Sequence, residues 1–308
     1  MKRLSVVAVI VVLAMFSAAC GSSDNGGAIQ QKGTTTSRPS TAGAGSLKSK
    51  LPAAIASAGV LKVGSDIEYP PVESYPGGDS SKQPEGIDPD IARAMGEKLG
   101  VTVTFVNDTD FAGIIGALQS GRFDLIMSAM NDTAERRKKG ADFIDYFTAG
   151  TSILVKKGNP IGIKTPDDLC GHTVAVQKGT VQDTDILTPQ VGKCDNAGKP
   201  LNVLRFEKDT DALQQVKNGR AVANLEDFPV AAYNAKTSGG GNDFQAVNVP
   251  GIGPGSYGIA VLKSNTQLRD ALRAALKAVI TDGTYDRILT KWNVTAGALK
   301  TAAINGGS

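Results

Sequence analysis

The stretch from Leu118 to Met127 reads LQSGRFDLIM, and it joins the end of a helix to a buried strand through a glycine. The same kind of joint recurs at Val216–Leu225, where the sequence reads VKNGRAVANL. Polar residues follow each strand: Ser128-Ala129-Met130-Asn131 after the first and Glu226-Asp227 after the second. Ligands of open α/β sheets bind beyond the carboxyl ends of the strands. Two such edges facing each other would form a cleft, with hydrogen-bond donors on one wall and acids on the other.

Apolar runs alternate with amphipathic helical patterns on both sides of these joints, which is typical of βαβ units. The alternation predicts two α/β sheets. The first series consists of strand Val60–Gly64, helix Asp90–Leu99, strand Val101–Val106, helix Ile114–Gln119 and strand Phe123–Ser128. The second consists of strand Thr173–Val176, a helix near Asp183–Pro189, strand Leu201–Phe206, helix Thr210–Asn218 and strand Ala221–Leu225. A last amphipathic helix is predicted over Thr266–Ile280.

The first twenty residues have the composition of an export signal. Lys2 and Arg3 precede the apolar run Leu4–Phe16, which is shorter than the ~20 residues that a membrane-spanning helix needs. Small residues then lead to Cys20, and this ending resembles the bacterial lipobox, in which the cysteine is acylated. We therefore expect residues 1–19 to be a signal peptide and Cys20 to anchor the exported chain to the outer face of the cytoplasmic membrane. An ordinary cleaved signal with an incidental cysteine is the alternative.

Residues 20–48 are rich in Gly, Ser, Thr and Ala and contain almost no large apolar side chains. Such a segment cannot bury enough surface to offset its ordering entropy, so we expect a flexible tether. The remaining part, about 260 residues, is long enough for two lobes of ordinary size. Without Lys2 and Arg3 the chain keeps 31 of its 33 basic side chains against 30 acidic ones. This near-neutral balance argues against nucleic acid as a partner.

The chain contains three cysteines and one histidine. If Cys20 carries lipid, Cys170 and Cys194 remain as a disulfide pair suited to an oxidising compartment; the second is expected in a polar loop. The single His172 allows no histidine-based metal cluster and no Ser-His-Asp arrangement. We therefore predict no metal, no cofactor and no catalytic residue.

Several short segments carry a more specific signal. In order they are Gly64–Glu73, Gly86–Ala92, Asp110–Ile115, Asp124–Met130, Thr133–Arg136, Val174–Thr180, Glu226–Ala231, Tyr257–Val261 and Asp282–Asp286. As a set they resemble the polar-amino-acid solute-binding proteins (family 3) of ABC importers, although Ala134 stands where that family usually has proline. The resemblance covers about Leu61 to Trp292.

The resemblance implies an α/β, two-lobed fold of the type II periplasmic-binding-protein kind, with two hinge crossovers. Lobe one would comprise residues 49–149 and 255–308, and lobe two residues 150–254. It also implies a monomer that captures a polar or charged amino acid between the lobes and delivers it to ABC permease subunits in the membrane. One alternative is an amino-acid sensor or accessory subunit. Another is a cyclohexadienyl-dehydratase-like enzyme, whose catalytic Glu would fall at or near Val230, which cannot do acid chemistry.

An α-amino acid presents a carboxylate and an ammonium, so its site needs a bidentate donor and an acid. Arg136 is the predicted donor, because Thr133 can cap the helix whose first turn holds it, and the resemblance implies the same role. A solvated helix face is the alternative. Asp227 is the predicted ammonium partner, since it follows the strand Ala221–Leu225 and precedes Pro229. Its alternative role is to cap its own helix.

The resemblance implies further ligand contacts. Tyr69 and Phe111 would flank the ligand, although either could instead belong to the core. The Gly179-Thr180 loop would offer backbone N–H groups to the ligand carboxylate. The remaining predicted contacts are hydrogen bonds from Ser128, Asn131 and Gln182, and an acidic side-chain pocket formed by Asp66, Gln177, Glu73 and Glu226. Asp66 could equally cap a turn. This set is consistent with Gln, Glu, Asn or a basic amino acid.

Overall fold

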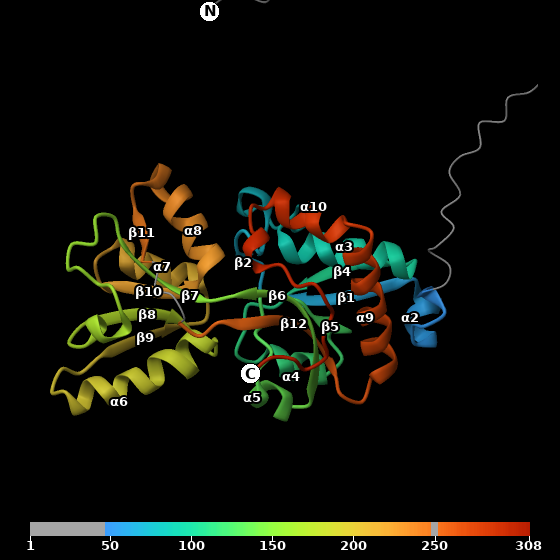
Figure 1. Ribbon diagram of the computed structural model, residues 1–308, viewed down its shortest axis with the longest axis horizontal. Helices are drawn as coiled ribbons and strands as arrows, with labels where there is room; N and C mark the ends of the chain where they lie inside the picture. The colour runs from blue at the N-terminus through green and yellow to red at the C-terminus, as the bar shows by residue number, and fades with distance from the viewer. Residues whose placement is uncertain (1–46, 248–251) are drawn as a thin grey trace, which may run out of the picture. The chain divides into compact units, whose positions relative to one another are not determined.

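The computed structural model describes residues 47–247 and 252–308, and every structural statement below concerns this part of the chain. The predicted signal peptide, Cys20 and nearly all of the predicted tether lie outside it. Within it, helices and strands alternate and form two five-stranded sheets and one two-stranded ribbon (Figure 1).

The first sheet has the strand order β4-β1-β5-β12-β6 within the described residues. Its strands are β1 (Val60–Ser65), β4 (Thr102–Asn107), β5 (Leu125–Ile126), β6 (Ala141–Ala149) and β12 (Gly255–Leu262). β1 pairs in parallel with β4 and β5, whereas β12 runs antiparallel to β5 and β6. The carboxyl ends of β1 and β5 therefore meet at one edge of the sheet, just before Asp66 and Ser128.

Helices cover both faces of this sheet (Figure 1). They are α2 (Ala53–Ala58), α3 (Ile87–Leu99), α4 (Ile114–Gln119), α5 (Ala134–Lys138), α9 (Thr266–Thr281) and α10 (Thr284–Lys291). α3, α9 and α10 pack over one face with a large apolar cluster, and α4 covers the other face with a smaller one. The predicted apolar stripe of α9 is buried, including Leu268, Leu272 and Val279.

The second sheet has the strand order β11-β7-β10-β8-β9 within the described residues. Its strands are β7 (Thr151–Lys156), β8 (Thr173–Gln177), β9 (Asn202–Phe206), β10 (Ala223–Asp227) and β11 (Phe244–Val247). Its helices are α6 (Thr188–Asn196), α7 (Asp209–Lys217) and α8 (Phe228–Thr237), and a π-helical segment, η3 (Gln182–Leu187), runs directly into α6. β8 and β10 are parallel, so Gln177 and Asp227 lie at the same edge.

The chain crosses between the sheets twice. β6 continues into β7 through Gly150, and β12 returns the chain to the first sheet after β11. The crossings lie side by side, since the Thr151 N–H donates to the Ile252 carbonyl at 2.9 Å. The ribbon β2 (Glu68–Tyr69) and β3 (Glu73–Ser74) belongs to the first lobe. Four 3-10 turns complete the description: η1 (Pro76–Gly78), η2 (Pro166–Leu169), η4 (Ser238–Gly241) and η5 (Thr295–Gly297).

Two sequence expectations need correction. The strand predicted over Phe123–Ser128 pairs only at Leu125–Ile126, because the chain turns into the polar segment directly afterwards. Cys194 lies in α6 and is buried, not in a polar loop. Its polar neighbours are the exposed face of that helix, whereas the sulfur points inward and is bonded to Cys170, with the two Cα atoms 5.1 Å apart.

Candidate functional site

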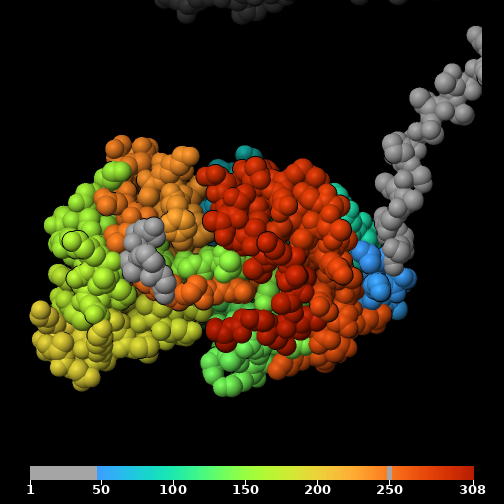
Figure 2. All heavy atoms as spheres, viewed as in Figure 1, coloured from blue at the N-terminus to red at the C-terminus, as the bar shows by residue number. Residues whose placement is uncertain are grey.

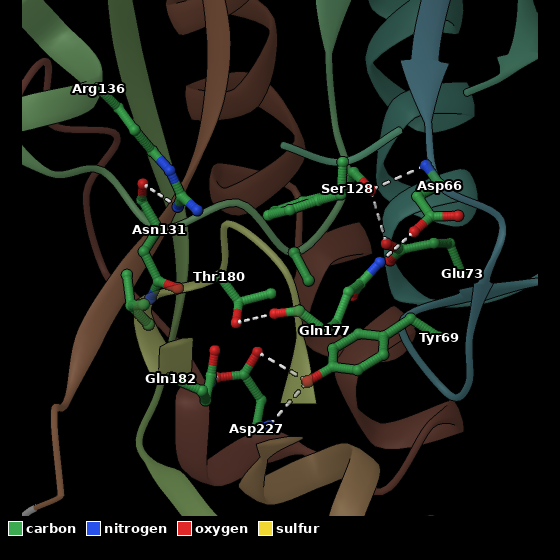
Figure 3. Close-up of a pocket in the computed structure, with 13 residues that line it drawn as sticks. Asp66, Tyr69, Glu73, Ser128, Asn131, Arg136, Gln177, Thr180, Gln182 and Asp227 are labelled. Atoms are coloured by element: carbon green, nitrogen blue, oxygen red, sulfur yellow. Dashed lines mark hydrogen bonds between the residues drawn. The ribbon is translucent and has the colours of Figure 1, made fainter. Parts of the chain in front are cut away.

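A polar cavity lies where the strand ends of both sheets meet (Figure 3). Ten of the residues predicted as ligand contacts line it: Asp66, Tyr69, Phe111, Ser128, Asn131, Arg136, Gln177, Thr180, Gln182 and Asp227. Glu73, Ala129 and Val181 complete the wall.

Arg136 lies at one end of the cavity, in the five-residue helix α5. Thr133 caps this helix by accepting from the Arg136 N–H at 3.2 Å, as the sequence predicted. The guanidinium is buried and donates to two neutral carbonyls, of Asn131 at 2.9 Å and Gly179 at 3.1 Å. The Phe111 ring lies 5.3 Å from it. The alternative of a solvated helix face is therefore wrong.

The Arg136 charge lacks an acidic partner. No carboxylate forms an ion pair with it among residues 47–247 and 252–308. Burial lowers its pKa to about 10, so it stays protonated at neutral pH. A buried cation whose hydrogen bonds go to neutral carbonyls favours an anionic ligand.

Asp227 ends β10 and comes from the second lobe. Its carboxylate accepts from the Tyr69 hydroxyl at 3.2 Å and from Gln182 Nε2 at 3.0 Å. Burial raises its pKa to about 6, although these hydrogen bonds oppose the shift. It occupies the N-cap position of α8, but in the described structure its side chain makes no cap hydrogen bond. The carboxylate therefore serves the cavity and not its own helix.

Asp66, Glu73 and Ser128 form an acidic group at the end of the cavity away from Arg136 (Figure 3). The Ser128 hydroxyl donates to Glu73 Oε1 at 2.9 Å and accepts from the Asp66 N–H at 2.9 Å. Gln177 Nε2 donates to Asp66 Oδ2 at 2.6 Å. The other oxygens, Asp66 Oδ1 and Glu73 Oε2, are buried and have no hydrogen-bond donor within the described residues.

Burial also sets the protonation of this acidic group. It raises the pKa of Asp66 to about 7, and Gln177 opposes the shift. Burial, followed by the charge of the adjacent Asp88, raises the pKa of Glu73 well above its usual range. Burial therefore favours the neutral form of both carboxyls while no cation is bound.

Three pairs of cavity residues are hydrogen-bonded across the cavity from one lobe to the other. Tyr69 reaches Asp227, Gln177 reaches Asp66, and Arg136 reaches Gly179. The lobes are thus closed on each other in this structure. Each of these contacts joins a residue near a strand end of the first lobe to one at a strand end or loop of the second.

Two sequence expectations fail at this site. Glu226 does not line the cavity, because neighbouring residues of a strand point to opposite faces, and its carboxylate bonds to Asn224 and Asn234 inside the second lobe. The Gly179 N–H, expected to face a ligand, donates instead to Asp183 Oδ2 at 3.1 Å. Gly179 is nevertheless required there, because a Cβ would lie 2.8 Å from that of Ala112.

One residue that supports the cavity wall from behind, Asp88, was not predicted from the sequence. Asp88 accepts from the Ala129 N–H at 3.0 Å and from the Tyr146 hydroxyl at 2.6 Å. These bonds hold Ala129 at a φ of 43°, which is unusual for a residue with a side chain. The motif Gly86–Ala92 contains Asp88, but only the fold places its carboxylate beneath the strand end of β5.

The described residues give no sign of a membrane-spanning or metal-binding element. No helix in the part of the chain that the structure describes is long and apolar enough to cross a bilayer. Over the same residues, no group of three or more His, Cys, Asp or Glu side chains is placed to hold a metal ion.

Two α/β lobes, two crossovers and a buried polar cavity between strand ends define a cleft-type ligand-binding protein of the type II periplasmic class, which confirms the predicted fold. Residues 61–295 match the bacterial extracellular solute-binding proteins, family 3, and the chain belongs to that family. The family predicted from the sequence is therefore confirmed.

Individual relatives support the assignment of the chain to this family. The chain is 33% identical to the arginine-binding protein ArgT of Corynebacterium glutamicum over 84% of its own length and 82% of the relative's. It is 30% identical to the L-cystine-binding protein TcyJ of Escherichia coli over 76% of its own length and 82% of the relative's. A crystal structure of the ancestral amino acid-binding protein AncCDT-1, described as a precursor of cyclohexadienyl dehydratase, superposes with a TM-score of 0.68 at 38% identity, covering 78% of this chain and 97% of that one.

Proposed function

We propose that this protein captures a basic amino acid, arginine in the first instance, in the closed cleft and delivers it to an ABC importer. Arg136 would hold the ligand carboxylate, Asp227 the α-ammonium, and Asp66 the side-chain cation. One observation carries the proposal: across the cavity from the buried Arg136 lie two buried carboxylates, each with one oxygen that has no donor among the described residues, and Arg136 forms no ion pair with a carboxylate of that part of the chain.

The charges of the cavity favour a ligand with two cations and one anion. Arg136 supplies one positive charge, whereas Asp227, Asp66 and Glu73 are three acids within the same wall. A zwitterion would neutralise Arg136 and Asp227 but leave the other two acids without a cation. An acidic ligand would add a second carboxylate beside them, and burying like charges together is costly.

The geometry of the acidic end suits a guanidinium. Asp66 Oδ1 and Glu73 Oε2 are two separate acceptors, and a guanidinium offers five N–H donors in a planar fork. A glutamine amide has only two donors and no charge, so it would satisfy the acceptors without pairing the acids. The similarity to ArgT supports arginine. The similarity to TcyJ means that the choice of ligand needs a direct test.

The decisive comparison is between arginine and citrulline, which has nearly the same shape but no side-chain charge. Titration calorimetry should give arginine an affinity at least about 30-fold higher, equal to ~2 kcal/mol. A thermal unfolding screen with all twenty amino acids should rank arginine and lysine first, since a ligand at ~100 times its Kd adds ~2.7 kcal/mol to stability. Tighter binding of citrulline, glutamine or cystine would reject the proposed ligand class.

We also propose that the chain is a lipoprotein with a signal peptide at 1–19, a tether at 20–48, and lobes at 49–149 with 255–308 and at 150–254. The charged start, the apolar run and the small residues before Cys20 support the lipid anchor. Cys20→Ser should release the protein into the medium without changing its ligand affinity. Retention of that variant in the membrane fraction would reject acylation at Cys20.

We propose a binding role without catalysis. Val230, which falls at or near the position of the dehydratase acid, lies in α8, is fully buried against the large apolar cluster of the first sheet, and is not part of the cavity wall. The AncCDT-1 structure is itself described as an amino acid-binding protein. An assay for prephenate turnover should show none, and measurable turnover would reject this part of the proposal.

A further inference from the structure

The helix that carries Arg136 is too short to hold itself in place. α5 spans only Ala134–Lys138, and isolated helices of this length are unstable in water. Thr133 caps one of its first N–H groups. The N–H of Ala134, at the start of α5, donates at 2.7 Å to the carbonyl of Ser308, which lies 174 positions further along the chain. The start of α5 is therefore fixed from outside.

Residues 298–308 reach this helix by following the edge of the first sheet. They form bridges to β6 at Phe147 and Ile144, where Ala298 and Ile304 are the partners. The Asn305 N–H also donates to the Phe143 carbonyl at 3.0 Å. β6 is the last strand of its sheet, so the segment covers an otherwise unpaired edge. In Figures 1 and 2 these dark-red residues run down to the green segment that contains α5.

We name this segment, residues 298–308, the strap. The end of the strap forms hydrogen bonds with residues on both sides of Arg136. The Gly307 N–H donates to Asp132 Oδ2 at 2.9 Å. Arg137 donates from Nη1 to Asp132 Oδ1 at 2.6 Å and from Nη2 to the Ser308 carbonyl at 3.0 Å. The Asp132 side chain is fully buried. Charge-assisted hydrogen bonds in a buried setting are among the stronger polar contacts, so this network restrains α5.

Close packing fixes the register of the strap. A Cβ on Gly307 would lie 2.1 Å from the Asp132 carbonyl oxygen, and one on Gly306 would lie 2.7 Å from Asp145 Oδ2. Only glycine lets the strap approach the backbone before α5 this closely. A shift of the strap would move Asp132 and Arg137, and with them Arg136.

We propose that the strap positions the ligand site: through Asp132, Arg137 and the start of α5, it holds the Arg136 guanidinium in the cavity. The proposal rests on the proposed function, in which Arg136 binds the ligand carboxylate. Arg137 and Gly307 are positioning residues, since neither lines the cavity. The strap thus links the far end of the described chain to the affinity of the cleft.

The test is a double-mutant cycle on arginine affinity, measured by titration calorimetry. Arg137→Gln and Gly307→Ala should each weaken binding about tenfold, because both loosen the network around α5. Lys138→Gln is the matched control, since Lys138 lies on the same helix but pairs only with the exposed Glu135, and it should stay within twofold. In an Arg136→Ala background the strap substitutions should change affinity less than twofold, because no guanidinium remains to be positioned.

Each outcome has a distinct meaning. If Arg136→Ala weakens binding but the strap variants bind like the unmodified protein, the strap proposal is overturned and the proposed function stands. An equal loss in both backgrounds would also overturn it, since the strap would then act through general stability. If Arg136→Ala binds normally, the proposed function itself fails. Deletion of residues 305–308, with circular dichroism to check folding, provides a second variant with the same expected result as Arg137→Gln.

Discussion

Tyr69 and Asp227 are 158 positions apart and belong to different lobes, yet one phenol connects them twice. The Tyr69 hydroxyl donates to the Asp227 carboxylate at 3.2 Å and accepts from the Asp227 backbone N–H at 2.8 Å. Burial raises the pKa of Tyr69 well above its usual range, so it remains a donor at neutral pH. Because this contact needs both lobes together, it stabilises the closed form.

Tyr69→Phe should weaken arginine binding at least about fivefold, because it removes both hydrogen bonds of the phenol and each net hydrogen bond is worth ~1 kcal/mol. Calorimetry gives the affinity, and small-angle scattering should show incomplete compaction at subsaturating ligand. Tyr233→Phe is the control, since Tyr233 is an exposed residue of α8. Unchanged affinity in Tyr69→Phe would mean that the contact does not contribute to closure.

Arg136→Ala should reduce affinity by ~2 to 5 kcal/mol, as for other charge pairs truncated in a desolvated setting. This is at least about 30-fold, since ~1.4 kcal/mol is tenfold. Arg136→Lys should recover only part of the loss, because an ammonium cannot form the bidentate pair. Binding by Arg136→Ala within about threefold of the unmodified protein would place the ligand carboxylate elsewhere.

Arginine affinity should depend on pH through Asp66. Burial raises the pKa of this carboxyl to about 7, and only its ionised form can pair with a cation. Affinity should therefore fall by up to about tenfold per pH unit below 7 and level off above it. Calorimetry in buffers of different ionisation enthalpy should detect proton release on binding. In Asp66→Asn this dependence should be reduced, and an unaltered pH profile in that variant would assign it to another group.

The stability of the ligand-free protein should change with pH in the direction opposite to the arginine affinity. Burial raises the pKa of Asp66 and Asp88 to about 7 and that of Asp227 to about 6, all above the unfolded value of 3.8. Between these limits the folded state binds more protons, so stability falls as pH rises from about 4 to about 6 for Asp227 and to about 7 for Asp66 and Asp88. Each such group changes the free energy of unfolding by up to ~1.4 kcal/mol per pH unit. Thermal unfolding should give a higher Tm at pH 5 than at pH 8; the reverse order would contradict these shifts.

Removal of the disulfide should lower stability without altering the cleft. Cys170 and Cys194 are 24 positions apart, and closing a loop of that size contributes ~3 kcal/mol in the chain-entropy model. Neither cysteine lines the cavity. Reduction should thus lower Tm and leave arginine affinity within twofold. Two free thiols in mass spectrometry of unreduced protein would show that the bridge does not form.

The sequence allowed the site to be predicted where the fold obeys local rules. The Thr133 cap and the end of a buried strand made Arg136 and Asp227 candidates, and the resemblance to the family favoured the ligand-binding roles over the alternatives of a solvated helix face and a helix cap. A helix cap and a strand end can both be recognised from residues that are close together in the sequence. The wrong prediction for Glu226 also has a local cause. Side chains alternate between the two faces of β10, so Glu226 and Asp227 cannot both point into the cavity.

Long-range contacts could not be predicted in the same way. Nothing near Tyr69 indicates that its hydroxyl meets Asp227, because that pairing depends on how two lobes close. The strap is a similar case: no helix or strand was predicted over Asn305, Gly306 and Gly307, and the edge of β6 gives them a defined path. Cys194 was misplaced because a short polar helix with one buried face resembles a loop in sequence.

The order of strands also constrains the sequence of assembly during export. All strands of the second sheet lie between Thr151 and Val247, so that lobe can assemble as soon as this contiguous stretch has emerged from the translocation channel. The first sheet must wait, because β12 (Gly255–Leu262) inserts between β5 and β6. A chain stalled before β12 would therefore present a finished second lobe beside an incomplete first one, and we expect it to be the species that chaperones and proteases outside the membrane encounter.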